Sequence, residues 1–162
     1  MKKTFLLILL ILVLIVLSFI FVEHKDYAQG SGQTSDIQLL ARAINGEARG
    51  ESYEGQVAVG AVILNRVKHP SFPNTIAGVI YEPGAFTAVS DGQINHPIDE
   101  NSTVYKAARD AMNGWDPTNG CIYYFNPNTA TNKWIWSKPI IKTIGYTATK
   151  EEGMIMLAKY NS

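Results

Sequence analysis

An unbroken hydrophobic run lies close to the start of the chain. Residues 5–22 contain one polar residue, Ser18, and they follow Lys2 and Lys3. As a helix, this run is just long enough to cross the roughly 30 Å hydrocarbon core of a bilayer. We therefore predict a signal-anchor or transmembrane segment over residues 1–22, with a secreted product as the alternative if the segment is cleaved. The two lysines favour an N-terminus in the cytoplasm and a membrane-anchored, extracytoplasmic domain.

Helical periodicity begins after a polar, glycine-rich stretch, residues 23–34, which we interpret as a flexible tether. Hydrophobic spacing then predicts helices at about 35–47, 53–67, 74–80 and 102–113. Strand-like runs follow at 121–125, 134–136 and 140–144, and residues 85–89 are a further short strand or extended wall. Because helices come first and strands last, the fold class is α+β: a helical core with a small antiparallel sheet.

The first predicted helix carries an unusual residue on its hydrophobic face. Four residues lie at the i, i+3, i+4, i+7 spacing of a core-facing stripe: Ile37, Leu40, Ala41 and Ile44. The next position on that stripe is Glu47, and a carboxyl group is rarely buried unless it is paired or functional. Partial desolvation favours the protonated carboxylic acid, which is the form that a general acid needs. The alternative is a helix that frays at Gly46 and leaves Glu47 solvated.

The second predicted helix, 53–67, is hydrophobic nearly all round and has many small side chains. We expect it to be the buried central helix, packed closely by its neighbours. Asn65 and Arg66 near its end either cap carbonyl groups or line a site, and we interpret both as structural.

Aromatic residues gather in the C-terminal third: Trp115, Tyr123, Tyr124, Phe125, Trp134 and Trp136. Strand alternation places Tyr123 and Phe125 on one face and Tyr124 on the other, so the core cannot take all of them. Flat, amphipathic rings beside Asn126 suit the faces and hydroxyl groups of sugars. Ordinary hydrophobic packing, with hydroxyl groups at the rim, is the alternative.

Charge and cysteine content exclude several classes of protein. Fourteen basic residues balance fourteen acidic ones, so no nucleic-acid partner is expected. The single cysteine, Cys121, excludes an internal disulfide. A Cys/His hydrolase would pair it with His69 or His96, but Cys121 has no local signature and we interpret it as a buried thiol. The histidines lack metal-ligand spacing and no phosphate loop or dinucleotide fingerprint occurs, so we expect neither a metal nor a cofactor.

Five segments together resemble one family. They are AINGEARGE at 43–51, YEGQVAVGAVILNRV at 53–67, FPNTIAGVIY at 72–81, YYFNP at 123–127 and WIWSKP at 134–139. In this order they resemble the catalytic domain of SleB-type spore cortex-lytic enzymes and the related CwlJ-type cell wall hydrolases. The resemblance runs from about residue 36 to residue 145. It predicts a catalytic domain over 35–145 and leaves 146–162 as an atypical C-terminal tail.

The resemblance implies a peptidoglycan-cleaving enzyme with a lysozyme-like or transglycosylase-like core, acting in germination, sporulation or wall remodelling. It implies that Glu47 is the catalytic acid. In SleB-type enzymes the reaction is lytic transglycosylation next to muramic acid residues of the spore cortex. The N-terminal peptidoglycan-binding repeats of SleB-type proteins have no room here, and the tail departs from the family's histidine-containing end.

The chemistry of a glycosidic bond determines how many carboxyl groups each type of enzyme needs. Its oxygen leaves poorly unless it is protonated, so one carboxyl must be held neutral beside it. A hydrolysing muramidase needs a second carboxylate, for which the candidates are Glu51, Glu54, Glu82 and Asp91. A lytic transglycosylase needs only one, because the 6-hydroxyl of muramic acid attacks. We expect Glu51 to be an electrostatic or positioning residue.

The sequence therefore predicts a monomeric enzyme that binds peptidoglycan glycan strands, with Glu47 as its catalytic residue. The expected substrate-binding residues are Glu51, Tyr123, Tyr124, Phe125, Asn126, Trp134 and Trp136. Three alternatives remain open: a hydrolysing muramidase, a catalytically inactive glycan-binding module, and an amidase or peptidase that uses Cys121.

Overall fold

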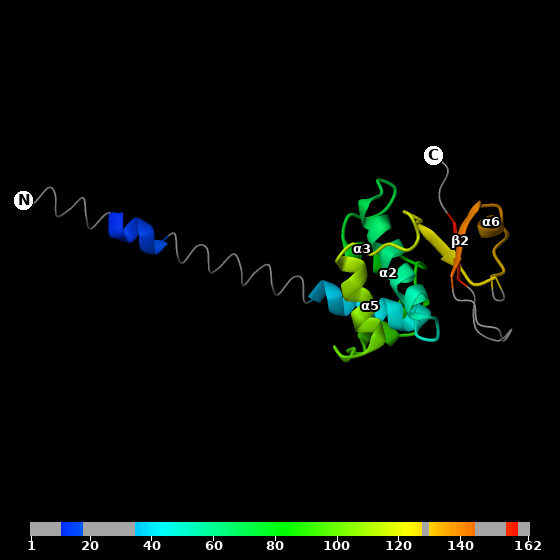
Figure 1. Cartoon of the computed structure of the whole chain (residues 1–162), viewed down its shortest axis with the longest axis horizontal. Coiled ribbons are helices and arrows are strands. Elements are labelled where there is room, and N and C mark those ends of the chain that lie inside the picture. Colours follow the sequence, from blue (N-terminus) through cyan, green and yellow to red (C-terminus); the bar gives the residue numbers. More distant parts are fainter. Residues whose placement is uncertain (1–10, 18–34, 128–129, 145–154, 159–162) are drawn as a thin grey trace, which may run out of the picture. The chain divides into compact units, whose positions relative to one another are not determined.

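A computed structural model describes residues 11–17, 35–127, 130–144 and 155–158 (Figure 1). The chain divides into two compact units, Met1–Ser35 and Asp36–Ser162. In the first unit, residues 11–17 form a helix with exposed hydrophobic side chains. The rest of the predicted segment 1–22 and the whole of the tether 23–34 lie outside the described residues. Within the described ranges, no helix has the length and hydrophobicity needed to cross a membrane, and the anchor stays a prediction.

Helices make up most of the second unit. A helix over residues 35–48 is followed by α2 (Tyr53–Lys68), α3 (Ile76–Ile80), α4 (Thr87–Ser90), the 3-10 helix η1 (Gln93–Asn95) and α5 (Thr103–Met112). Three of these helices begin after a hydroxyl side chain that accepts a hydrogen bond from a backbone N–H three residues on: Ser52, Thr75 and Ser102. Such N-caps satisfy a backbone donor that the helix leaves unpaired. The four predicted helices are confirmed, with ends that differ by at most two residues.

The helix α2 lies at the centre of the domain, against α3 and α5. Every residue from Gly55 to Ile63 is buried. A Cβ atom added at Gly60 would lie 3.0 Å from Ile44 Cδ1 and 3.1 Å from Ala111 Cβ, so three helices approach one another at this glycine. The prediction of a buried, small-sided central helix is confirmed.

The helix over residues 35–48, called the first helix of the domain below, turns its predicted hydrophobic stripe towards this core. Leu40, Ala41 and Ile44 are fully buried, and Ile37 is partly buried against the same cluster. Burial of large aliphatic side chains stabilises the fold by about 1.5–3 kcal/mol each. The stripe therefore fixes the rotation of the helix and the direction in which Glu47 points.

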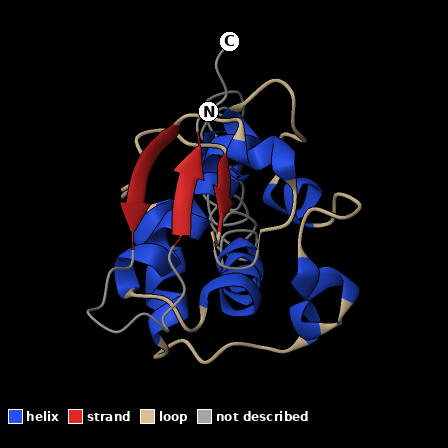
Figure 2. Ribbon diagram, turned by 90° about the vertical axis from the view of Figure 1, so that its right-hand side faces the viewer, coloured by secondary structure: helices blue, strands red, loops and turns tan. Residues whose placement is uncertain are grey.

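A three-stranded antiparallel sheet follows the helices (Figure 2). It comprises β1 (Tyr123–Phe125), β2 (Ile140–Ile144) and β3 (Ile155–Ala158), in the spatial order β1-β3-β2. Tyr124 and Lys142 both pair with Leu157 of the central strand. The strand β3 lies beyond the predicted domain boundary at residue 145. It is the only part of the predicted tail 146–162 within the described residues.

Two of the predicted strands are wrong, and a third is shorter than predicted. Residues 134–136 belong to a helix, α6 (Lys133–Trp136), because the side chain of Asn132 accepts a hydrogen bond from the Trp134 N–H and begins a helical turn. Residues 85–89 contain the start of α4. In 121–125 the strand begins at Tyr123, because the Cys121 N–H donates to the Thr118 hydroxyl instead of to a neighbouring strand.

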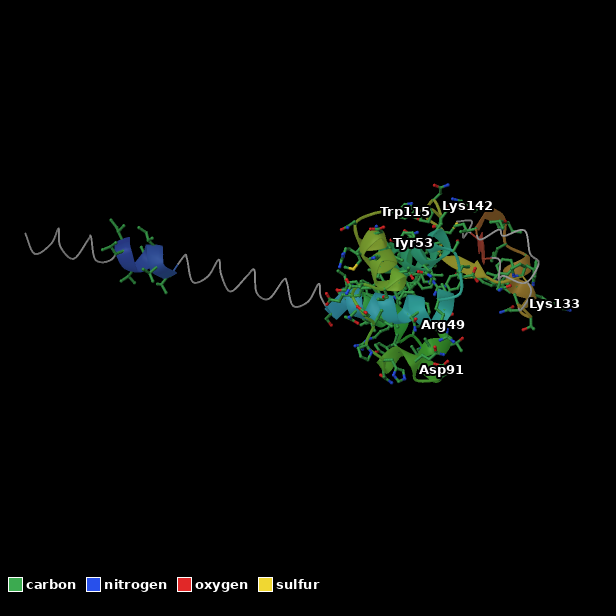
Figure 3. The ribbon with its side chains drawn as sticks, turned by 60° about the horizontal axis from the view of Figure 1, so that its bottom comes forward. Arg49, Tyr53, Asp91, Trp115, Lys133 and Lys142 are labelled. Atoms are coloured by element: carbon green, nitrogen blue, oxygen red, sulfur yellow. The ribbon has the colours of Figure 1, made fainter. Side chains whose placement is uncertain are left out.

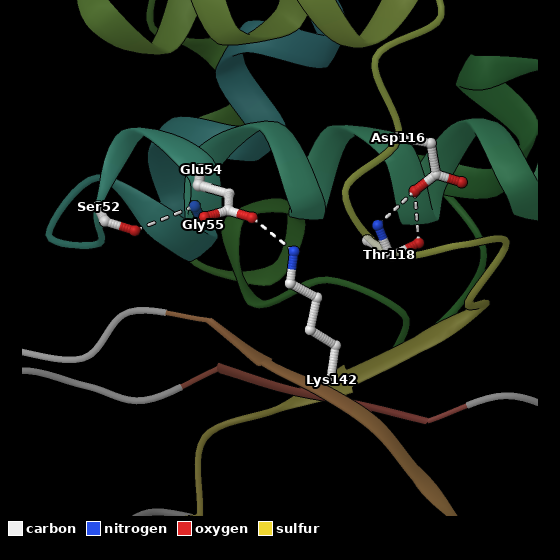
Figure 4. A network of polar contacts seen from close by, with 6 residues as sticks. All are labelled: Ser52, Glu54, Gly55, Asp116, Thr118 and Lys142. Atoms are coloured by element: carbon white, nitrogen blue, oxygen red, sulfur yellow. Dashed lines mark hydrogen bonds and ion pairs between the residues drawn. The ribbon is translucent and has the colours of Figure 1, made fainter.

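A polar turn around Asp116 and Thr118 connects α5 to β1 and is hydrogen-bonded to Asn65 of α2 (Figure 4). One carboxylate oxygen of Asp116 accepts from the backbone N–H and the hydroxyl of Thr118, at 2.7 and 2.6 Å. The other accepts from Asn65 Nδ2 and Gly120 N, both at 2.9 Å. Cys121 is buried, and its thiol donates to the Thr118 carbonyl at 3.0 Å. The predictions of a buried thiol and of a structural Asn65 are confirmed.

Replacing Asp116 by Asn is expected to destabilise the protein by about 1–3 kcal/mol at pH 7, because buried donors lose a charged acceptor. Burial alone raises the pKa of Asp116, but the hydrogen bonds from Thr118, Asn65 and Gly120 outweigh it and hold the pKa below 3.8. A lowered carboxylate pKa stabilises the fold above the unfolded pKa, and this stability is lost as the pH falls through the folded pKa. Urea unfolding between pH 7 and pH 3 measures both effects. An Asn variant that loses as much stability on acidification as the natural protein would contradict this assignment.

Candidate active site

Three elements of the domain meet at the carboxylate of Glu47, which is half-buried in the last turn of the first helix. Its Oε1 accepts hydrogen bonds from the backbone N–H groups of Thr87, at 2.9 Å, and Ala88, at 3.3 Å. Its Oε2 accepts from the hydroxyl of Tyr124 at 3.1 Å. One side chain therefore joins the first helix, α4 and β1. Partial burial agrees with the hydrophobic stripe, but the three donors do not follow from it.

The contact with α4 explains why residues 87–90 are helical. The first N–H groups of a helix need acceptors outside it. Phe86 occupies the N-cap position of α4 and has no polar side chain to supply one. Glu47 supplies the acceptor from 40 residues earlier. The helix and the carboxylate therefore hold each other in place.

Gly46 permits this close approach. A Cβ atom added at Gly46 would lie 2.3 Å from the Cβ of Ala88, well inside any real contact distance. A side chain at residue 46 would therefore push α4 away from Glu47. The helix continues through Gly46 to residue 48, so the alternative of fraying at this glycine is wrong.

A polar chain next to Glu47 connects the first helix to η1. Arg49 Nη1 donates to Gln93 Oε1 at 2.7 Å, and Gln93 Nε2 donates to Asp91 Oδ2 at 2.6 Å. The hydrogen bonds from Gln93, and then the charge of Arg49, lower the pKa of Asp91. Arg49 and Asp91 are the two ends of this chain of hydrogen bonds (Figure 3). Asp91, one of the candidates for a second carboxylate, thus accepts hydrogen bonds from the backbone N–H and the side-chain amide of Gln93.

Tyr124 faces the helical core, whereas its neighbours Tyr123 and Phe125 face α6. The predicted alternation is confirmed. Burial, and then the negative charge of Glu47, raise the pKa of Tyr124 well above its ordinary value. Its hydroxyl therefore stays protonated and remains a donor to Glu47.

Arg66 brings a positive charge close to Glu47 and Tyr124. Its Nε donates to the Ile122 carbonyl at 2.8 Å, which agrees with the predicted structural role, while its charge also lies near Glu47. Three aromatic rings lie 5.4–5.7 Å from its guanidinium carbon: Phe72, Phe86 and Tyr123. Burial lowers its pKa, while Tyr124, Tyr123, Glu82 and Glu47 oppose that shift. Nothing in the local sequence of α2 indicates this proximity.

The predicted aromatic residues form a second group, around α6. Trp134 and Trp136 are 45% and 47% exposed, and they lie against Tyr123 and Phe125 with ring centroids 5.0 and 4.9 Å apart. Phe125 is buried with Ile135, so it supports Trp136 from beneath. Both tryptophans are therefore partly exposed, and Lys138 Nζ lies over the Trp134 ring, 4.5 Å from its centroid. Tyr123 connects Trp134 to Arg66.

The remaining predicted residues lie outside the helices and strands, except Glu54, which is in the first turn of α2. The Glu51 N–H donates to the Ala48 carbonyl at 3.0 Å, just past the first helix. The Asn126 carbonyl accepts from the Ala130 N–H at 2.9 Å. Glu54 pairs with Lys142 at 2.6 Å and Glu82 is exposed. Within the described ranges, no three His, Cys, Asp or Glu side chains gather closely enough to hold a metal ion.

Comparison with known families identifies the class of protein. A family model described as Cell Wall Hydrolase matches residues 50–148, which is more than half of the chain. The chain therefore belongs to the cell wall hydrolase family. Glu47 lies three residues before the first matched position.

Within this class the chain is similar to spore cortex-lytic enzymes. It is 65% identical to the enzyme of Bacillus cereus over 111 residues, covering 68% of this chain and 42% of that protein. It is 33% identical to the cell wall hydrolase CwlJ of Bacillus subtilis over 101 residues, covering 58% of this chain and 69% of that protein. The chain thus spans about two fifths of the length of the spore cortex-lytic enzymes it matches.

Two solved structures have a similar fold. The crystal structure of the catalytic domain of the Bacillus cereus SleB protein has a TM-score of 0.68 and 58% identity, and covers 78% of this chain and 91% of that one. The catalytic domain of the germination-specific lytic transglycosylase SleB from Bacillus anthracis has the same score and identity, and covers 76% and 93%. The helix-rich fold with few strands is therefore that of a SleB catalytic domain.

Proposed function

We propose that this protein is a lytic transglycosylase that cleaves peptidoglycan glycan strands next to muramic acid, with Glu47 as its single general acid and base. Membership of the cell wall hydrolase family supports peptidoglycan as the substrate. The main support for Glu47 as the acid is the set of three hydrogen bonds that fixes its carboxylate between the first helix, α4 and β1.

The hydrogen bonds distinguish the two oxygens of Glu47. The two N–H groups at Oε1 can only donate, so Oε1 must be an acceptor. The Tyr124 hydroxyl at Oε2 can both donate and accept, so Oε2 is the oxygen that carries the proton. In the first step Oε2 protonates the glycosidic oxygen as the bond from that oxygen to the anomeric carbon breaks. The 6-hydroxyl of the muramic acid then attacks the anomeric carbon and gives its proton back to Oε2.

Tyr124 and Arg66 stabilise the negative charge that Glu47 acquires when it gives up its proton. A hydroxyl donor at 3.1 Å stabilises a carboxylate more than a neutral acid. The positive charge of Arg66 acts in the same direction. Both groups are fixed before the reaction, so they stabilise the developing charge without reorganising.

Replacing Tyr124 by Phe is expected to lower kcat about tenfold or more, because a hydrogen bond to a charged group is lost. The ring keeps its packing, so the melting temperature should change little. Release of soluble muropeptides from purified peptidoglycan measures kcat. Tyr105→Phe, which alters another buried tyrosine on α5, is the matched control. Equal rates for Tyr124→Phe and the natural protein would remove Tyr124 from the mechanism.

Mass spectrometry of the products tests the reaction itself. Intramolecular attack yields 1,6-anhydro ends, which weigh one water less than reducing ends. Reducing ends would instead show a hydrolysing muramidase. Binding to peptidoglycan without release of fragments would favour an inactive glycan-binding module, a role for which the exposed Trp134 and Trp136 are suited. Cys121 is buried, which disfavours the thiol-dependent alternative.

We also propose that the domain acts outside the cytoplasm. The hydrophobic run that follows Lys2 and Lys3 supports this location. Protease accessibility of the domain on intact protoplasts tests it, because a cytoplasmic domain would stay protected.

A further inference from the structure

Two exposed aromatic rings lie apart from the residues that contact Glu47. Tyr53 is the first residue of α2, and Trp115 follows α5 (Figure 3). Gly114 adopts a left-handed conformation, with φ of +100°, which turns the chain back after α5. The Trp115 N–H then donates to the Asp110 carbonyl at 3.0 Å. The packing of α2 against α5 therefore brings the two rings together.

These three residues, Tyr53, Asp110 and Trp115, form what we call the Tyr53–Trp115 patch. The ring centroids lie 5.9 Å apart and the ring planes make an angle of 46°. Tyr53 is 38% exposed and Trp115 is 44% exposed. Large aromatic side chains carry much of the energy of binding surfaces, and an adjacent, half-exposed pair is typical of such a surface.

The patch is held rigid before any ligand arrives. The Tyr53 hydroxyl donates to Asp110 Oδ2 at 2.8 Å. Burial, and then the hydrogen bond and charge of Asp110, raise the pKa of Tyr53 to about 12. The hydroxyl therefore stays neutral near pH 7 and remains a donor to Asp110. Aromatic side chains fixed in this way lose little conformational entropy on binding.

Each acidic side chain beside the patch has a basic side chain near it, and this balance of charge favours an uncharged ligand. Arg109 lies close enough to oppose the effect of Asp110 on Tyr53. Glu54, next to Tyr53 in sequence, pairs with Lys142 at 2.6 Å (Figure 4). A locally neutral surface attracts neither the carboxylates nor the amino groups of peptide stems. An uncharged ring with one hydrophobic face and hydroxyl donors matches two aromatic faces beside a carboxylate.

We propose that the Tyr53–Trp115 patch is a second carbohydrate-binding subsite, which holds an uncharged N-acetylated sugar of the glycan strand at a distance from the bond being cleaved. This inference rests on the proposed function, because it takes the glycan strand as substrate. The sugar ring stacks on Trp115 and Tyr53, and a hydroxyl donates to Asp110. The patch adds affinity for long strands and plays no part in proton transfer.

Binding to insoluble peptidoglycan tests the subsite independently of cleavage. Each substitution is made in a Glu47→Gln background, and the bound fraction is measured on purified sacculi whose peptide cross-links are intact, so that the substrate stays insoluble. Trp115→Ala and Tyr53→Ala are each expected to weaken binding about tenfold. Tyr81→Ala, which removes another exposed tyrosine outside the patch, is expected to bind as before. The weakening that each substitution causes should be the same at low and at high salt, because the ligand of the patch is uncharged.

A second measurement guards against variants that fold poorly. Asp110→Asn keeps the size of the side chain, and it is expected to weaken binding severalfold with an unchanged melting temperature. In the otherwise natural protein, Trp115→Ala should raise KM for long strands and leave kcat unchanged. Binding within twofold of the parent for all three patch variants would overturn the proposal, as would a weakening that is present at low salt and absent at high salt. A Glu47→Gln protein that still cleaves would overturn the proposed function, while the binding comparison would still decide on the patch.

Discussion

Replacing Glu47 by Gln is expected to reduce the rate of muropeptide release by about 10²–10⁴-fold, the usual contribution of a general acid. Gln matches Glu in shape but carries no transferable proton. Its carbonyl oxygen can still accept from the N–H groups of Thr87 and Ala88, so the N-cap of α4 is kept. The loss should therefore appear in kcat, with little change in the melting temperature or in binding to peptidoglycan.

Glu47→Ala separates the two roles of this side chain. Alanine removes the proton and also the acceptor that caps α4, and losing a cap costs about 0.5–2 kcal/mol. We therefore expect Glu47→Ala to be as inactive as Glu47→Gln but less stable in urea. Natural activity in Glu47→Gln would exclude Glu47 as the acid. Equal stability of the two variants would show that the contact with α4 contributes nothing to folding.

Replacing Gly46 by Ala is expected to destabilise the protein by about 1–3 kcal/mol and to reduce activity about 10²-fold. The new methyl group would lie 2.3 Å from the Cβ of Ala88, so α4 must move. That movement carries the N–H groups of Thr87 and Ala88 away from Glu47. Denaturant unfolding and muropeptide release measure the two losses.

A compensating substitution makes this test specific. Ala88→Gly removes the atom that clashes, and the new methyl group at residue 46 would then lie 3.4 Å from the Cα of residue 88, an ordinary contact. The double variant should regain much of the activity. Its free energy of unfolding should stay about 1 kcal/mol below that of the natural protein, because residue 88 is then a glycine within a helix. A double variant as inactive as Gly46→Ala would show that α4 is not what Gly46 accommodates.

The sequence predicts the helices because their signals are local. Hydrophobic residues on one stripe turn the first helix towards the core, and the hydroxyl residues Ser52 and Ser102 mark where the following helices begin. Glu47 stands out by the same local pattern, as a carboxyl on a hydrophobic face. The long-range partners of that carboxyl give no such signal, since Thr87 and Tyr124 lie 40 and 77 residues away.

The strands wrongly predicted at 85–89 and 134–136 also show the limits of local signals. Residues 85–89 look extended because Phe86 cannot cap a helix, and the missing acceptor comes from Glu47 in space rather than from a neighbour in sequence. Residues 134–136 alternate like a strand, but over only three residues a single side chain, Asn132, is enough to start a helical turn. The predicted substrate contacts of Trp134 and Trp136 stay predictions.

The position of β3 sets the order in which the contacts at Glu47 are completed during synthesis. Among the described strands, β1 and β2 each pair with β3 and not with each other. Glu47 leaves the ribosome early, but residues 155–158 leave it after every other described element. Until they arrive, β1 has no partner strand to hold Tyr124 against Glu47. On the proposed function, a chain that ends before residue 155 lacks the strand that positions Tyr124 at Glu47, and it is therefore expected to release muropeptides more slowly than the whole chain.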